Sequence, residues 1–196
     1  AQWLLDDYAY QRVAEDKAQT IGLPCVLEFW DSLPFWQTFF RALGYQTVVS
    51  EVRSAKRYEA GLSFVASDTI CFPAKVVHSH IMDLADKKAD RIFMPYIMHM
   101  PPEGPDKLSP YVCSVVMGYP MVVEHAQSPA ERYGVIWDAP VFHWFSEKDR
   151  QKQICAYAAD NSGVTLKEAR AAFSYAEQAL LTFRKRLTQM GQHVLD

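Results

Sequence analysis

Closely spaced cysteines are missing from this sequence. The four cysteines lie far apart along the chain, at Cys25, Cys71, Cys113 and Cys155. This spacing excludes a C-x-x-C redox motif and the dense pairing of a small secreted disulfide scaffold. We therefore expect reduced thiols and a cytoplasmic location.

Glycine-rich and nucleophile motifs are missing as well. The glycines are scattered singly, so the chain carries neither a dinucleotide-binding fingerprint nor a phosphate-binding loop. No G-x-S-x-G nucleophile elbow occurs either. The sequence thus lends no support to ATP binding, NAD binding or serine-hydrolase chemistry within this chain.

The sequence also has little net charge and no long apolar run. Its 20 basic and 23 acidic side chains leave a formal net charge of -3, which would not attract a polyanion, so we expect no nucleic-acid partner. No stretch reaches the roughly 18 apolar residues of a membrane span. The first twelve residues lack the basic start and apolar run of a secretory signal. We expect neither membrane insertion nor secretion.

Strand patterns alternate with helix patterns along most of the chain. With 49% hydrophobic and 22% charged residues, the composition is that of a packed globular protein. Because parallel strands need crossovers and helices supply them, this order predicts an α/β fold with a Rossmann-like parallel sheet and flanking helices. The predicted organisation is an N-terminal helix within 1–20, the α/β domain in 21–140 and a helical C-terminal extension in 141–196.

The individual elements follow from periodicity, caps and turn residues. Apolar and β-branched runs predict strands at 24–30, 46–50, 91–94 and 111–117. Helical spacing and capping residues predict helices at 35–43, 54–61, 73–88, 147–159 and 165–189. The proline-rich segment 95–110 is expected to be a loop, and the aromatic stripe at Phe35, Trp36, Phe39 and Phe40 is expected to pack in the core.

Two of the cysteines are candidates for chemistry. Cys71 lies just before the predicted helix start at Pro73, where free backbone N–H groups and the helix dipole favour a thiolate. Cys113 is expected at the start of a strand or within it, from where it could approach the loop that carries Cys71. A buried structural role remains the alternative for Cys71, and for Cys25 and Cys155 it is the expected one.

Two histidines follow Cys71 closely. A zinc site formed by Cys71, Cys113 and one histidine is therefore an alternative. His78 and His80 are two residues apart on a predicted helix and face different directions, which argues against both being ligands. Together with Lys75 they are candidates for the shell around a metal site.

Three short stretches of the chain are similar to one protein family. They are Ile21-Gly22-Leu23-Pro24, Pro34-Phe35-Trp36, and Cys71-Phe72-Pro73-Ala74-Lys75 followed by His78 and His80. Over roughly residues 21 to 125 the sequence resembles the activase-related proteins of the 2-hydroxyacyl-CoA dehydratase system.

The resemblance implies a redox module. Cys71 and Cys113 would be the first and second ligands of an iron–sulfur cluster of the 4Fe–4S type, with a third ligand expected beyond Asp196 in a longer protein. An ATP-dependent activase domain or subunit would be the partner, and an acyl-CoA the substrate from which the transferred electron helps to remove water. Ser114 and Ser79 depart from the family pattern, in which Pro and Gly are usual. The alternative is a non-catalytic α/β interaction module with no bound metal.

Overall fold

The computed structural model describes residues 8–52, 54–100 and 111–195. Its main sheet has four parallel strands in the order β2-β1-β3-β5. These strands are β1 (Thr20–Leu23), β2 (Gln46–Val49), β3 (Arg91–Phe93) and β5 (Ile136–Asp138). A second, two-stranded parallel sheet pairs β4 (Tyr96–His99) with β6 (Val141–His143).

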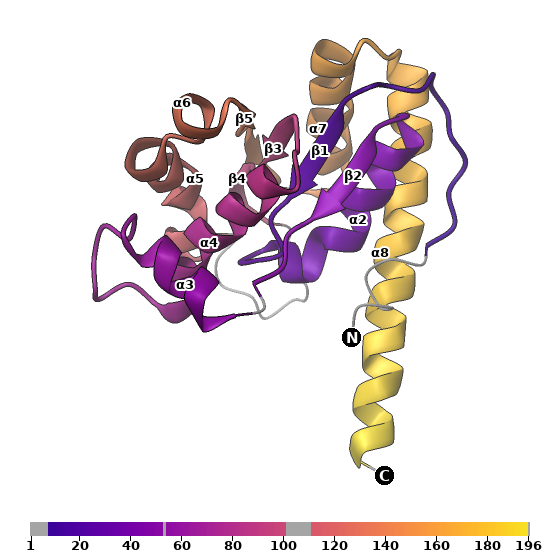
Figure 1. The fold of residues 1–196 in the computed structure, drawn as a ribbon. Helices are drawn as coiled ribbons and strands as arrows, with labels where there is room; N and C mark the ends of the chain where they lie inside the picture. Colours follow the sequence, from indigo (N-terminus) through magenta and orange to yellow (C-terminus); the bar gives the residue numbers. More distant parts are fainter. Residues whose placement is uncertain (1–7, 53, 101–110, 196) are drawn as a thin grey trace.

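Helices cover both faces of the main sheet (Figure 1). They are α2 (Phe29–Ala42), α3 (Ala55–Leu62), α4 (Phe72–Asp86), α5 (Ser114–Gln127), α6 (Pro129–Tyr133), α7 (Glu147–Ser162) and α8 (Leu166–Leu195). The connection from β1 to β2 runs through α2, whereas the connection from β2 to β3 runs through α3 and α4 and passes β1. The two connections run in opposite directions across the sheet, so right-handed crossovers put α2 on one face and α3 and α4 on the other. The predicted Rossmann-like α/β class with flanking helices and a helical C-terminal extension is confirmed.

The aromatic stripe of α2 lies in the core, as predicted. Trp36 has no exposed surface, and its ring centroid lies 4.7 Å from that of Phe93 on β3 and 6.1 Å from that of Phe142 on β6. Phe35 contacts Phe173 of α8 at 5.3 Å between ring centroids. One helix face therefore joins the main sheet, the small sheet and the C-terminal helix.

Two predicted helix starts are confirmed by their hydrogen bonds. The hydroxyl of Ser54 accepts from the backbone N–H of Arg57 at 3.2 Å and caps α3. Before α8, the N–H of Thr165 donates to the Glu168 carboxylate at 2.7 Å, and the N–H of Glu168 donates to the Thr165 hydroxyl at 3.2 Å. These short-range signals act as the sequence predicts.

The predicted N-terminal helix is wrong over residues 8–19, which form no regular element, and residues 1–7 lie outside the described part. The N–H groups of Val13 and Lys17 donate to the carbonyls of Ala42 and Gly44 at the end of α2. Pairing with another element thus satisfies backbone groups that a helix would have paired internally.

The strand predicted at 24–30 is also wrong in its position. The strand is β1, which ends at Leu23, and α2 already begins at Phe29. Val26 and Phe29 are each 1% exposed although neither lies in a strand. A short apolar run does not distinguish a buried strand from a buried helix start, and here the run leads into the buried start of α2.

The strand predicted at 111–117 is wrong because Ser114 begins helix α5. The β-branched Val115 and Val116 lie within that helix, whose packing against β4 and α4 overrides their strand preference. Strand β4 lies within the predicted loop 95–110, of which 101–110 are outside the described residues. Likewise, β6 interrupts the segment 141–196 that was predicted as helical.

Candidate functional site

Cys71 and Cys113 occupy the same kind of position on two neighbouring helices. Cys71 is the N-cap residue of α4 and Cys113 is the N-cap residue of α5. Neither thiol makes a side-chain capping hydrogen bond, and both residues are exposed free cysteines. Both thiols therefore lie beside the unpaired N–H groups and the positive dipole end of a helix N-terminus.

Both helices begin at the same edge of the main sheet. The 15-residue α4 ends at Asp86, shortly before β3 begins, so its first residue lies about 22 Å back toward the carboxyl ends of the strands. Helix α5 likewise ends just before α6 and β5, and α4 and α5 contact each other. The carboxyl edge is where open parallel α/β sheets bind their ligands.

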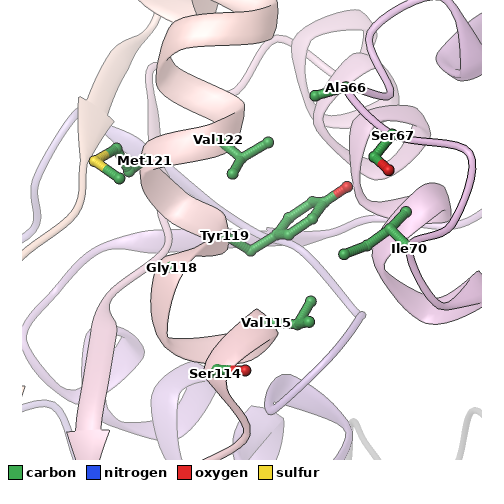
Figure 2. A pocket seen from close by; sticks show the side chains of 9 residues that line it. All are labelled: Ala66, Ser67, Ile70, Ser114, Val115, Gly118, Tyr119, Met121 and Val122. Carbon is green, nitrogen blue, oxygen red and sulfur yellow. The ribbon is translucent and has the colours of Figure 1, made fainter.

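A cavity of about 280 Å³ is lined by the residues next to both cysteines in the sequence, Ile70 and Ser114. One wall is the segment that leads into Cys71, and the other is the first half of α5, which follows Cys113 (Figure 2). The Tyr119 side chain reaches from α5 toward Ser67 and Ile70. The lining residues are Ala66, Ser67, Ile70, Ser114, Val115, Gly118, Tyr119, Met121 and Val122.

Tyr119 is a site residue that the sequence did not single out. Its hydroxyl lies 3.4 Å from Nε2 of His78, and the residue is 3% exposed. Burial raises the pKa of Tyr119 to about 12, and the negative charge of Cys71 adds to the shift. The phenol is therefore a neutral hydrogen-bond donor close to the Cys71 sulfur.

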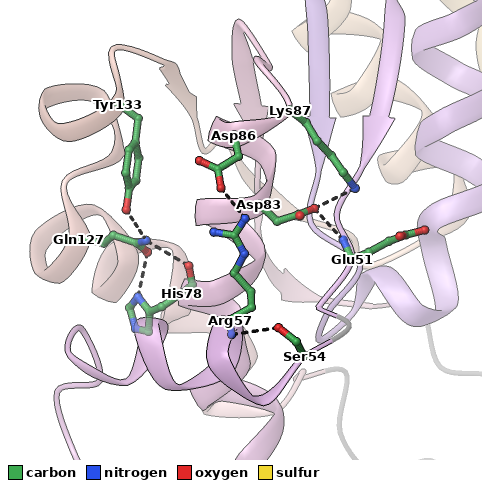
Figure 3. A network of polar contacts seen from close by, with 9 residues as sticks. All are labelled: Glu51, Ser54, Arg57, His78, Asp83, Asp86, Lys87, Gln127 and Tyr133. Atoms are coloured by element: carbon green, nitrogen blue, oxygen red, sulfur yellow. Dashed lines mark hydrogen bonds and ion pairs between the residues drawn. The ribbon is translucent and has the colours of Figure 1, made fainter.

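His78 is held in an internal polar network. Its Nδ1 lies 3.0 Å from Oε1 of Gln127, and Nε2 of Gln127 donates to the His78 carbonyl and to the Tyr133 hydroxyl (Figure 3). Because the amide oxygen accepts, Nδ1 carries the proton and Nε2 is left as the acceptor for Tyr119. Burial lowers the pKa of His78, so the ring is neutral at pH 7.

His80 points to a different part of the molecule, as its spacing from His78 predicts. Its Nδ1 lies 2.7 Å from Oγ of Ser50, which in turn accepts from the Cys25 N–H at 2.8 Å. Burial lowers the pKa of His80 to about 4. His80 therefore contributes to the contact between α4 and the ends of β1 and β2 rather than to the surroundings of the two exposed cysteines.

Lys75 positions the turn before Cys71. Its Nζ donates to the Asp68 carbonyl at 2.7 Å and so ties the turn that contains Asp68 to the first turn of α4. Helix α3 is fixed on α4 by an ion pair between Arg57 and Asp86 (Figure 3). Local contacts thus hold the segment that carries Cys71 on the protein body.

The described residues do not form a metal site by themselves. Among residues 8–52, 54–100 and 111–195 no group of three or more His, Cys, Asp or Glu side chains is placed to hold a metal ion. The zinc alternative needs a histidine beside the two thiols, whereas both His78 ring nitrogens already face Gln127 and Tyr119. Two exposed thiols at adjacent helix starts suit a cluster whose remaining ligands come from elsewhere.

The other two cysteines are buried, as predicted. Cys25 is 7% exposed and Cys155 is 2% exposed. Burial raises the pKa of the Cys155 thiol to about 11, which keeps it protonated at neutral pH.

Within the described residues, no helix combines the length and the apolar composition that crossing a membrane requires.

Comparison with curated proteins and with solved structures found no significant match. A family model, described as "CoA enzyme activase uncharacterised domain (DUF2229)", matches residues 20–196. This match covers the main sheet, both cysteine-bearing helix starts and the C-terminal helix. The chain belongs to this CoA enzyme activase domain family.

Proposed function

We propose that this chain is a redox module of an activase-related system, in which the thiolates of Cys71 and Cys113 supply two ligands of an iron–sulfur cluster. The observation that carries the proposal is the matched position of two exposed thiols at the starts of two helices in contact. Membership of a CoA enzyme activase domain family supports the proposal that the chain works together with an activase. The electron donor would be an ATP-dependent activase domain or subunit.

The residues around the thiols have separate tasks in this proposal. N–H groups at the starts of α4 and α5 stabilise negative charge on the sulfur atoms. Lys75 holds the turn before Cys71 in place, and the neutral Tyr119 side chain lines the cavity next to that turn. A bound iron–sulfur cluster would supply one-electron transfer at low potential. In the full system this electron would serve the removal of water from a 2-hydroxyacyl-CoA.

Anaerobic reconstitution with iron and sulfide tests the proposal. A small thiol such as glutathione is included, because the described residues supply two cysteine ligands and a cluster needs more. We expect the native chain to bind iron and inorganic sulfide and to show a broad absorption band in the visible spectrum. Cys71→Ser and Cys113→Ser are each expected to lose most of the bound iron, because either change leaves one thiolate ligand.

Cys155→Ala is the matched control. It removes a buried thiol on α7 that the proposed cluster does not use. Its iron content should equal that of the native chain. Equal iron content in all four proteins, or no iron uptake by the native chain, would contradict the cluster proposal.

The second candidate is a non-catalytic interaction module with no bound metal. The observation that favours it is that the described residues contain no complete metal-ligand set. In that case the α/β body binds a subunit of the activase system, and both cysteines remain thiols. Unchanged partner binding by the Cys71→Ser/Cys113→Ser double variant, together with the absence of iron, would favour this candidate.

A further inference from the structure

A pair of histidines lies apart from the two exposed cysteines, on the small sheet. His99 ends β4 and His143 ends β6, and their Nδ1 atoms are 3.1 Å apart. His99 is 8% exposed, whereas His143 is exposed to solvent. The two Nδ1 atoms therefore face each other at the edge of the small sheet, with the exposed His143 on the solvent side.

An irregularity in strand pairing brings the two rings together. Tyr96 pairs with Val141 and Ile97 with Phe142, but the register then shifts and His99 pairs with His143. In a regular ladder Met98 would lie opposite His143. Bulges of this kind commonly redirect side chains next to functional sites.

The surrounding contacts hold the pair in place. The side chain of Gln153 accepts from the His143 N–H at 2.9 Å and donates to the His143 carbonyl at 2.7 Å. The His99 ring centroid lies 4.3 Å from that of Phe145 and 4.6 Å from that of Tyr111. The backbone of His143 and the ring of His99 are thus held in place before any ligand binds, which lowers the entropic cost of binding.

We propose that His99 and His143 form a two-point binding site for a divalent transition-metal ion of the zinc, nickel and copper class. Metal–nitrogen bonds of about 2.0–2.1 Å at a tetrahedral angle separate two donor nitrogens by about 3.3 Å, close to the 3.1 Å found here. Neutral imidazole is the preferred nitrogen ligand of these ions.

Binding requires a tautomer change and a small rotation of the rings that turns both Nδ1 lone pairs toward the metal. Without metal, one Nδ1 donates a hydrogen bond to the other. On binding, that proton moves to Nε2 of the same ring through solvent, so both Nδ1 atoms become ligands and no net proton is released. Water completes the coordination, since no third protein ligand is found among the described residues. The site is independent of the proposed cluster.

Titration with Ni²⁺ alone and with Zn²⁺ alone by calorimetry tests this site. The protein carries Cys71→Ser and Cys113→Ser, so that failure of the cluster proposal does not affect the result. We expect one equivalent of metal to bind, with the dissociation constant raised at least about tenfold by His143→Gln because chelation is lost. Cu²⁺ bound to the parent should show electron paramagnetic resonance couplings from two imidazole nitrogens.

Two further variants make the result decisive. His125→Gln removes an exposed histidine on α5 outside the pair and should leave the affinity unchanged. His99→Gln should weaken binding as His143→Gln does. Equal affinity in the parent and His143→Gln, or coupling of Cu²⁺ to a single imidazole nitrogen, would overturn the proposal.

Discussion

Glu28, at the start of α2, carries a carboxyl group with one oxygen atom buried in the fold. Its Oε1 atom is buried and has no hydrogen-bond partner among the described residues, while the Ser32 hydroxyl donates to Oε2 at 2.7 Å. Burial raises the pKa of Glu28 to about 7, with a smaller contribution from the negative charge of Asp31. Sequence alone does not reveal this, because Glu28 stands in an apolar run that was predicted as a strand, which does not show where its side chain lies.

The raised pKa predicts a pH-dependent stability. The folded state holds the Glu28 proton to higher pH than the unfolded state, so the free energy of unfolding falls as pH rises from about 4.5 to about 7. Glu28→Gln removes this loss and should stabilise the protein at pH 8 by up to about 3 kcal/mol relative to the native chain. Urea denaturation of both proteins at pH 5 and pH 8 measures the difference.

Glu59→Gln, on the exposed surface of α3, serves as the control and should shift stability equally at both pH values. If the gain from Glu28→Gln is as large at pH 5 as at pH 8, the pKa of Glu28 does not cause it.

Helices α3 and α4 approach each other closely at one glycine. A Cβ atom at Gly61 would lie 2.2 Å from Oγ and 2.9 Å from the backbone nitrogen of Ser79. The second contact involves helix backbone, which cannot move without separating the two helices. Cys71 follows α3 and caps the start of α4, so the packing of these two helices also supports the candidate site.

Gly61→Ala is therefore expected to destabilise the protein by about 1–3 kcal/mol through overpacking. Gly191→Ala is the matched control, because nothing lies within 4 Å of a Cβ atom at that position on α8. The control should be neutral or should stabilise the helix by up to about 1 kcal/mol. Denaturant midpoints of the two variants measure both effects, and a neutral Gly61→Ala would contradict the close approach.

Helix α8 packs along α2 and joins the C-terminal extension to the rest of the protein. Phe173 of α8 is 5% exposed, and its ring faces Phe35 of α2. Arg150 of α7 lies between aromatic rings, with its guanidinium carbon 5.0 Å from the ring centroid of Phe35 and 5.3 Å from that of Phe173. Farther along, α8 projects beyond the rest of the protein (Figure 1).

The two parts of α8 should therefore respond differently to truncation of an apolar side chain. Phe173→Ala is expected to cost about 3–5 kcal/mol, which corresponds to a fall in Tm of roughly 10 °C for a chain of this length. Leu187→Ala, nearer the C-terminal end of α8 and 40% exposed, should change stability by less than about 0.5 kcal/mol. Calorimetry on both variants gives the comparison, and equal effects would show that α8 is not anchored through Phe173.

The sequence by itself determined the fold class, the caps at Ser54 and Thr165, and the position of a cysteine beside the start of α4. These features depend on signals within one turn or one strand: hydrogen-bonding side chains, proline, and the alternation of strand and helix patterns. The match to the activase family agrees with the resemblance carried by the residues around Cys71.

Only the tertiary structure decided where the remaining site residues lie. Val115 and Val116 predict a strand, yet packing of α5 on its neighbours makes Cys113 a helix cap like Cys71. The meeting of His99 with His143 depends on a register shift between strands more than 40 residues apart in the chain. Pairings of this kind are set by long-range packing and hydrogen bonds, which no local pattern of residues encodes.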